Sequence, residues 1–162
     1  MYRTHNCGEL RITNVGQNIM LSGWIQKIRK LGAMTFIDLR DRYGLTQLVI
    51  DDKSDSSLIA AVSGLGREFV VKIEGKVIER SSKNSKIPTG EVEVKVDNLI
   101  TLNSSETPPF TIEDDTDGGD ELRMKYRYLD LRRNPVIEAL LLRHRMAQEV
   151  RKYLDSKDFI EV

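Results

Sequence analysis

Apolar and polar residues alternate in five segments of the chain, and this spacing predicts five β-strands. The segments are residues 19–30, 33–41, 45–51, 67–79 and 91–102. The alternation is cleanest in the last of them, where Val92, Val94 and Val96 are separated by charged residues. Residues 54–66 have a different spacing that predicts a short helix, with Ser54 or Asp55 as its N-cap and Gly64 at its end.

The predicted order of three strands, a helix and two further strands matches the plan of the OB-fold, a small five-stranded barrel. Gly23 and Gly75 lie inside predicted strands, where glycine permits the sharp bends of barrel corners. We therefore expect a mainly β protein: an OB-fold barrel with a helix between strands 3 and 4, followed by a linker and a C-terminal helix. Other small β-barrels are the alternative.

The chain divides into three segments by composition. Residues 1–102 are expected to form the barrel, and residues 103–134 a linker or hinge that contains Pro108-Pro109 and Gly118-Gly119. Residues 135–162 begin as a helix, with Asn134 as the expected cap and Pro135 at the first helical position. This helix carries an apolar stripe and leads into the strand-like FIEV, so these residues resemble the opening of a second, truncated domain.

Composition narrows the classes of function. No segment is long and apolar enough for a membrane span or a secretory signal, and the single cysteine, Cys7, excludes an internal disulfide, so we expect a cytoplasmic protein. His5 and His144 lie in no metal-spaced or catalytic motif, and no catalytic or metal site is expected. The net charge is zero, but residues 103–122 hold seven acids and no Lys or Arg. The remainder has 25 basic against 18 acidic residues, which permits a polyanionic partner or simply a mixed solvated surface.

The outer face of strands 1 to 3 is the candidate binding surface. If Ile37 and Leu39 point into the barrel, Phe36 points out, and by the same alternation Gln47 points out of the next strand. An unpaired base can stack on an exposed ring, and an amide offers a donor and an acceptor to a base edge. The alternative is that Phe36 is a core residue and Gln47 ordinary surface.

Charged residues flank this face. Lys27, Arg29 and Lys30 end strand 1 and are expected to pair with phosphates. Glu93 repels phosphate, so it fits a nucleic-acid site only if it accepts hydrogen bonds from a base such as guanine. Otherwise it is a solubilising charge on a strand. Loop residues 83–86 either touch RNA backbone or are solvated.

Four segments together resemble a known family: CGELR, GWIQKIRKLGAMTFIDLRDRYGLTQLV, TGEVEV and LRMKYRYLDLRR. They are similar to the bacterial type of aspartyl-tRNA synthetase, and the similarity extends over the whole chain. The segment YRYLDLRR and the helix that ends in DFIEV resemble the hinge and the start of the first class II synthetase motif. Residues 1–102 resemble the anticodon-binding OB domain of that family.

The resemblance implies roles for particular residues. Phe36 would stack on the middle anticodon base, Gln47 would hydrogen-bond to it, and Glu93 would recognise a guanine-type first base. Further contacts to the anticodon loop are implied for Lys27, Arg29, Arg80 and Asn84, although an arginine is common in the family where this chain has Lys27.

The resemblance also implies a parent enzyme that attaches aspartate to tRNA with ATP and Mg²⁺ and is a homodimer. The ATP, Mg²⁺ and aspartate sites belong to a C-terminal domain beyond these residues, so we expect a fragment that binds aspartate tRNA, needs no cofactor, does not aminoacylate, and is a monomer or weak dimer. Alternatives are a lysyl- or asparaginyl-type synthetase domain, a single-stranded nucleic-acid binder without sequence preference, or an assembly module built on the C-terminal helix.

Overall fold

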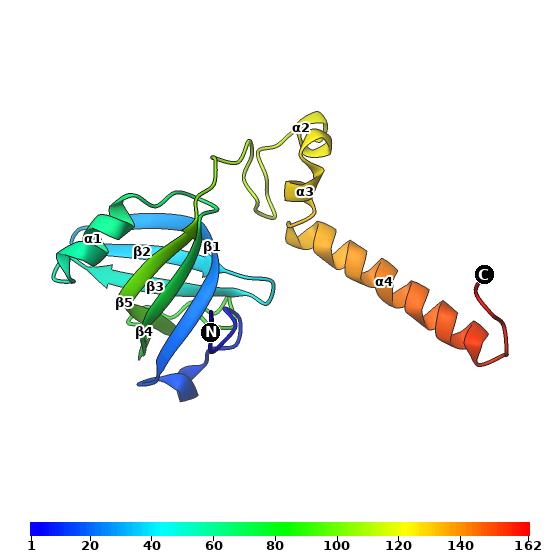
Figure 1. Ribbon diagram of the computed structural model, residues 1–162, viewed down its shortest axis with the longest axis horizontal. Helices are drawn as coiled ribbons and strands as arrows, with labels where there is room; N and C mark the ends of the chain where they lie inside the picture. The colour runs from blue at the N-terminus through cyan, green and yellow to red at the C-terminus, as the bar shows by residue number, and fades with distance from the viewer. The chain divides into compact units, whose positions relative to one another are not determined.

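Five β-strands and a helix make up the first part of the computed structural model, which describes all 162 residues (Figure 1). After a short 3-10 turn at Ile12–Asn14, the elements follow in the predicted order. They are β1 (Asn18–Leu31), β2 (Met34–Arg40), β3 (Leu45–Asp51), α1 (Ser56–Ser63), β4 (Val70–Glu79) and β5 (Val92–Asn103). Asp55 is the N-cap of α1, where its carboxylate accepts a hydrogen bond from the Ser57 backbone N–H, and Gly64 is the C-cap. The predicted caps are thus confirmed, with Asp55 rather than Ser54 at the start.

The strands close into a barrel in the order β1-β2-β3-β5-β4. All neighbouring pairs are antiparallel except β3 and β5, which run parallel. Three antiparallel strands, a helix and two strands closing the ring are the OB-fold, which confirms the predicted fold class. Gly23 fits against the backbone of β2, because a Cβ atom there would lie 2.3 Å from the Arg40 carbonyl oxygen.

Side chains that alternate along the strands fill the barrel interior. The inward valines of β5, Val92, Val94 and Val96, are at most 2% exposed, as their spacing predicts. Leu58 and Val62 of α1 join the same core cluster, together with Ile28 and Phe69 at its margin. Burial on this scale supplies most of the free energy of folding in a domain of this size.

A β-bulge in β1 sets the direction of its charged residues. Ile25 pairs with Leu39 and Lys27 pairs with Asp38, so Gln26 is an extra residue on one side of the ladder. Before the bulge, odd-numbered residues such as Ile25 point into the barrel. After it, even-numbered residues such as Ile28 do so. Lys27 is thereby placed on the outer face.

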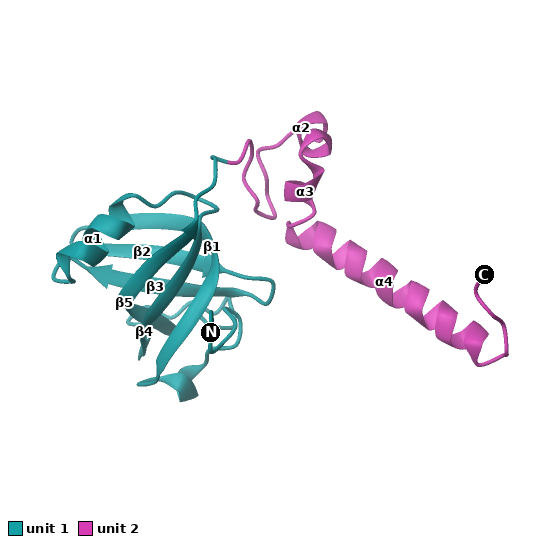
Figure 2. Ribbon diagram, in the orientation of Figure 1, with its two compact units in different colours: residues 1–107 teal, residues 108–162 magenta.

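Residues 108–162 form a second compact unit (Figure 2). It contains α2 (Asp120–Lys125), α3 (Arg127–Asp130) and α4 (Asn134–Asp155). Phe110, Ile112 and Leu129 make a small core of their own, in the segment expected to be a linker. The boundary between the two units falls after Thr107, whereas the composition placed it after residue 102.

A buried carboxylate organises the turn before α4. Asp130 is fully buried and accepts a 2.8 Å hydrogen bond from Nη1 of Arg133. Arg133 also donates from Nε to the carbonyl of Glu113 over 2.9 Å and from Nη2 to the carbonyl of Asp114 over 2.8 Å. One arginine thus fastens the acidic segment to α3, an arrangement of charged groups that hydrophobic patterning does not reveal.

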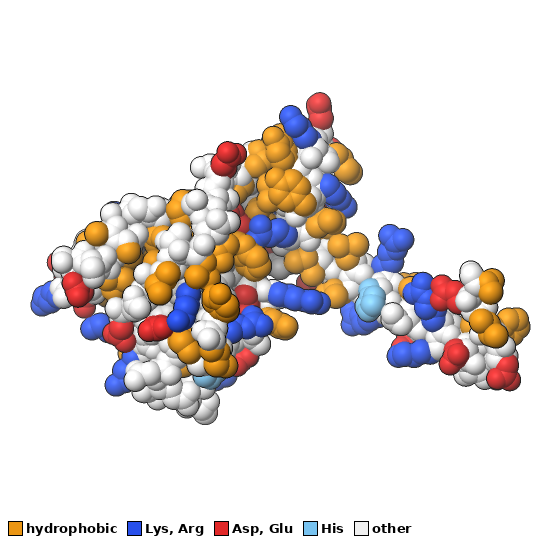
Figure 3. Space-filling model, in the orientation of Figure 1, with side chains coloured by type: hydrophobic (Ala, Val, Ile, Leu, Met, Phe, Trp, Pro, Cys, Tyr) orange, Lys and Arg blue, Asp and Glu red, His pale blue; other side chains and the backbone are white.

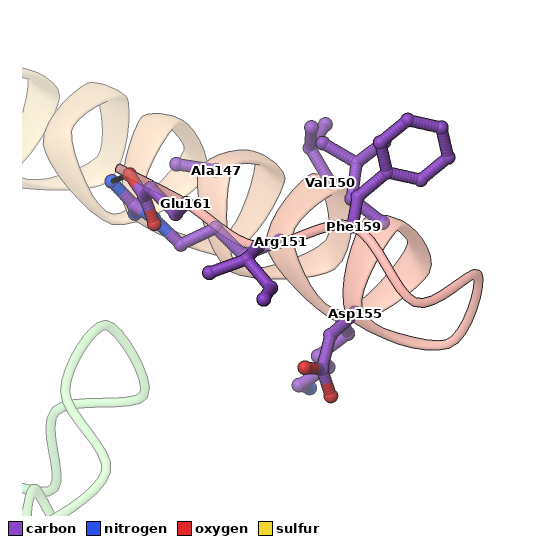
Figure 4. Close-up of a pocket in the computed structure, with 9 residues that line it drawn as sticks. Ala147, Val150, Arg151, Asp155, Phe159 and Glu161 are labelled. Atoms are coloured by element: carbon purple, nitrogen blue, oxygen red, sulfur yellow. Dashed lines mark hydrogen bonds and ion pairs between the residues drawn. The ribbon is translucent and has the colours of Figure 1, made fainter.

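The helix α4 starts at Asn134 with Arg133 as its N-cap, one residue earlier than predicted. Its apolar stripe is exposed, and Figure 3 shows hydrophobic side chains gathered at its C-terminal end. There a hollow is lined by residues such as Ala147, Val150 and Phe159, beside a pair of hydrogen bonds from Arg151 to Glu161 (Figure 4). None of the helices has both the length and the apolar character that crossing a membrane requires.

Candidate nucleic-acid interface

Two rows of side chains cross the outer face of the barrel. The register pairs Lys27 with Asp38 and Asp38 with Gln47, and Gln47 reaches Glu93 on β5. The next row joins Arg29, Phe36, Val49 and Lys95, one residue from each of the same four strands. Five of the seven residues predicted to bind RNA therefore lie in adjacent positions of one sheet face, with Lys27 at its edge.

A hydrogen-bond network connects the polar members of these rows. The side-chain amide of Gln47 donates from Nε2 to Oε2 of Glu93 over 2.7 Å. Its oxygen Oε1 accepts from Nη2 of Arg80 over 3.1 Å and from Nη2 of Arg29 over 3.3 Å. Arg29 also donates to Oδ1 of Asp38 over 2.6 Å. Arg29, Gln47, Arg80 and Glu93 are thus brought together as one connected group.

Gln47 is more enclosed than the alternation suggests. It points outward as predicted, but it is only 7% exposed, and Glu93 is 9% exposed. The long side chains that hydrogen-bond to Gln47 account for its enclosure on the outer face. The amide is therefore not a freely solvated group. It is held in one orientation, with its donor directed at a carboxylate and its acceptor directed at two guanidinium groups.

Phe36 lies on the outer face and is half-buried. Phe36 is not part of the core cluster of the barrel. The inward residues that follow it on β2, Ile37 and Leu39, are fully buried members of that cluster. Its partner across β3, Val49, is 3% exposed yet also lies outside that cluster. An aromatic ring in this position presents part of its surface to solvent, and Arg29 is its cross-strand partner on β1.

The loop between β4 and β5 borders the same face. Arg80 begins it and is joined to the network through Gln47. Asn84 lies further along, half-buried, with its backbone N–H bonded to the Gly90 carbonyl over 2.9 Å and its side-chain oxygen bonded to the Lys86 N–H over 3.0 Å. A Cβ atom at Gly90 would lie 1.7 Å from the Asn84 carbonyl oxygen, so the loop closes only with glycine there. No hydrogen bond joins the Asn84 side chain to the network.

This arrangement suits recognition of unpaired bases better than catalysis. The network presents two carboxylates, one amide and two guanidinium groups, with the Phe36 ring in the next row. Such groups pair with base edges and stack on base faces. Lys27 and Lys95 are exposed around it and can contact phosphates. Lys30, expected to do the same, instead alternates with Arg29 to the opposite face of the sheet, where it lines a hollow with Ile59 and Val62 of α1. No group of three or more His, Cys, Asp or Glu residues is placed to hold a metal ion.

The sequence analysis assigned no role to two members of the surface. Asp38 fixes the Arg29 guanidinium, and Lys95 extends the face onto β5. The bulge at Gln26 was missed as well, although the change from Ile25 to Ile28 in the apolar spacing is the signal that marks it.

Two family models match the chain. The model described as an OB-fold nucleic acid binding domain matches residues 19–102, just over half of the chain. The model described as tRNA synthetases class II (D, K and N) matches residues 119–162. The two matches fall within the first and second structural units.

Named relatives match the chain over its full length. An aspartate–tRNA ligase of Bacteroides thetaiotaomicron is 63% identical over 162 residues, and one of Flavobacterium psychrophilum is 58% identical over 163 residues. Each match covers 100% of this chain and 28% of the relative, so the chain spans under a third of the length of these proteins.

Solved structures share the fold. The aspartyl-tRNA synthetase of Entamoeba histolytica superposes with a TM-score of 0.86 at 18% identity, over 98% of this chain and 38% of that one. The asparaginyl-tRNA synthetase of Pyrococcus horikoshii gives 0.80 at 23% identity, over 100% of this chain and 36% of that one. At these identities the likeness concerns the fold alone.

Proposed function

This chain belongs to the family of OB-fold nucleic-acid-binding domains, and from that premise we propose that its barrel recognises the anticodon of aspartate tRNA. The observation that carries the proposal is the network of Gln47, Glu93 and the two arginines beside the outward ring of Phe36. The names of relatives about 60% identical over the whole chain direct the choice of tRNA.

Each residue of the network has a chemical task in this proposal. A guanine presents two donors, N1–H and N2–H₂, and the carboxylate of Glu93 accepts from both. The middle base stacks on Phe36, and the amide of Gln47 hydrogen-bonds to its edge. The arginines hold that amide in place and lower the repulsion between Glu93 and the phosphates of the RNA.

The remaining candidates contact the RNA backbone. Lys27 is exposed at the edge of the face and meets a phosphate, and Asn84 contacts the anticodon loop from the β4–β5 loop. Lysine is a point charge without the fork of arginine, so Lys27 contributes affinity rather than base selectivity.

The activity of a whole protein of this kind is a further proposal. We infer that it attaches aspartate to tRNA in the cytoplasm, with ATP and Mg²⁺ bound outside the residues described above, and that it is a homodimer. We assign no residue among positions 1–162 to the attachment of aspartate to tRNA. We expect these residues alone to be a monomer or weak dimer, which sedimentation velocity at micromolar concentration tests.

Binding of three stem-loops tests the recognition. We expect the GUC anticodon stem-loop to bind more tightly than otherwise identical stem-loops with GUU or UUU anticodons. A preference for GUU or UUU overturns the assignment in favour of an asparaginyl- or lysyl-type domain. Poly-U is the control for binding without sequence preference, because its equal competition with the GUC stem-loop excludes base-specific recognition.

A further inference from the structure

Tyr43 exposes an aromatic ring at one end of the interface, in the turn between β2 and β3. The residue is 59% exposed, and the guanidinium carbon of Arg3 lies 5.7 Å from the centroid of its ring. So exposed a side chain contributes little to the stability of the barrel. None of the roles proposed above for base recognition uses it.

The turn that carries the ring is firmly held. The carboxylate of Asp41, whose side chain is 5% exposed, accepts hydrogen bonds from the backbone N–H groups of Tyr43 over 2.7 Å and Gly44 over 3.1 Å. Its other oxygen accepts from the Cys7 N–H over 2.9 Å and lies 3.6 Å from Nη1 of Arg3. One buried carboxylate therefore positions both the backbone of Tyr43 and the cation over its ring. Because the backbone of the turn is already ordered, less conformational entropy is lost when a base stacks on the ring.

The position of the turn links it to the proposed binding surface. Tyr43 precedes β3, whose first residue, Leu45, accepts a hydrogen bond from the Thr89 hydroxyl. Thr89 closes the β4–β5 loop, which contains Asn84. The turn is therefore beside that loop, at the end of β3 that leads to Gln47. Arg42, the exposed residue before Tyr43 in the turn, adds a second positive charge to this turn.

We propose that Tyr43, with Arg3 over its ring, is a second stacking platform that takes one base of the same RNA strand outside the three anticodon bases. The proposal rests on the proposed function, and it extends the RNA path along the β3 edge from Gln47 to the turn. Stacking on an aromatic ring accepts any base, and the arginine adds a cation–π contribution. The platform therefore adds affinity for the stem-loop and no selectivity for the anticodon.

Binding of a GUC stem-loop and of the bare GUC trinucleotide to the 162-residue chain tests the platform. We expect Tyr43→Ala to lower stem-loop affinity by about tenfold, the loss of one stacked base, and to leave trinucleotide affinity unchanged. Tyr43→Phe keeps the ring and should bind as the wild type does. Tyr153→Ala on α4 removes a tyrosine that is 64% exposed and should have no effect.

Fluorescence of 2-aminopurine identifies the stacked nucleotide. We expect one loop position outside the anticodon to be quenched by the wild type and by Tyr43→Phe but not by Tyr43→Ala. Wild-type stem-loop affinity in Tyr43→Ala, with the GUC preference intact, overturns the platform alone. A wild-type protein without preference for GUC overturns the proposed function, and the platform with it.

Discussion

Gln47 and Glu93 are 46 positions apart in the sequence, yet the amide of one donates to the carboxylate of the other over 2.7 Å. Both are nearly buried on the outer face of the barrel, in β3 and β5, which run parallel to each other. The hydrogen bond joins the group proposed to recognise the middle base to the group proposed to recognise the first. A base that binds to either residue therefore meets a side chain that the other residue already holds in a fixed orientation.

Replacement of Glu93 by glutamine tests recognition of the first base. The amide retains the size of the side chain and an oxygen that can accept from Gln47, but it loses the charge that favours the two donors of guanine. We expect the ratio of affinities for G and A at the first position to fall by roughly tenfold, since hydrogen bonds to a charged group are about 1–2 kcal/mol stronger. Anisotropy titrations with GUC and AUC stem-loops measure this ratio.

The exposed Asp97 supplies the matched control on the same strand. Asp97→Asn makes the same change of charge and should leave the ratio unaltered. An unchanged ratio in Glu93→Gln contradicts the role assigned to the carboxylate.

The Phe36 ring is expected to contribute stacking energy. Phe36→Ala should weaken binding of the GUC stem-loop by about 1–3 kcal/mol, the range for loss of one stacked base. Because the ring is half-buried and lies outside the core cluster, the variant should still unfold cooperatively. Titration of the RNA together with thermal unfolding followed by circular dichroism measures both effects. Phe36→Tyr retains a ring and should bind nearly as the wild type does, whereas an unfolded Phe36→Ala protein shows that the ring is structural.

The salt dependence of binding tests the contact between Lys27 and a phosphate. Lys27→Gln should weaken all stem-loops alike and reduce the slope of log affinity against log salt by about 0.7, the value for one phosphate contact on a single strand. Titrations at four salt concentrations give the slope. Lys157→Gln removes an exposed positive charge from the second unit and should leave the slope as it is. The same result for both variants argues against a specific contact at Lys27.

Hydrophobic alternation predicted the strands well because alternate side chains of each strand point into the barrel, where only apolar side chains pack without a loss of hydration. Val94 and Ile37 are fully buried, and their spacing alone reveals the inward face. The same spacing oriented Phe36 and Gln47 outward, as the structure has them. The RNA-binding roles of these residues came from a family resemblance and stay predictions until they are measured.

Polar burial escaped the sequence because it depends on pairing across distant strands. Arg29 of β1, Arg80 of the β4–β5 loop and Glu93 of β5 enclose Gln47. These residues are far apart in the sequence, so no local pattern predicts that they meet. Residues 103–134 were expected to be a linker because residues 103–122 are acidic and contain Pro108-Pro109 and Gly118-Gly119. Their order depends instead on a few apolar residues such as Phe110 and on Arg133 bonded to Asp130.

The buried thiol of Cys7 makes the stability of the barrel sensitive to alkaline pH. Burial, reinforced by the nearby Asp41 carboxylate, raises the pKa of this thiol far above its ordinary value. The folded state therefore keeps the proton, while the unfolded chain loses it above about pH 8.5. Stability is complete below that pH and falls as pH rises, by up to about 1.4 kcal/mol per pH unit for this group.

Urea unfolding between pH 8 and 10.5 measures the dependence, and Cys7→Ala isolates it. The alanine variant is expected to be less stable by a constant amount, because it leaves a small cavity in the core. Its free energy of unfolding should fall less steeply with pH than that of the wild type, since lysine and tyrosine titrations are common to both proteins. Parallel curves for the two proteins contradict a protonated, buried thiol. Rapid labelling of the folded protein by a thiol reagent at pH 8 contradicts it as well, because Cys7 is 0% exposed and reacts only after unfolding.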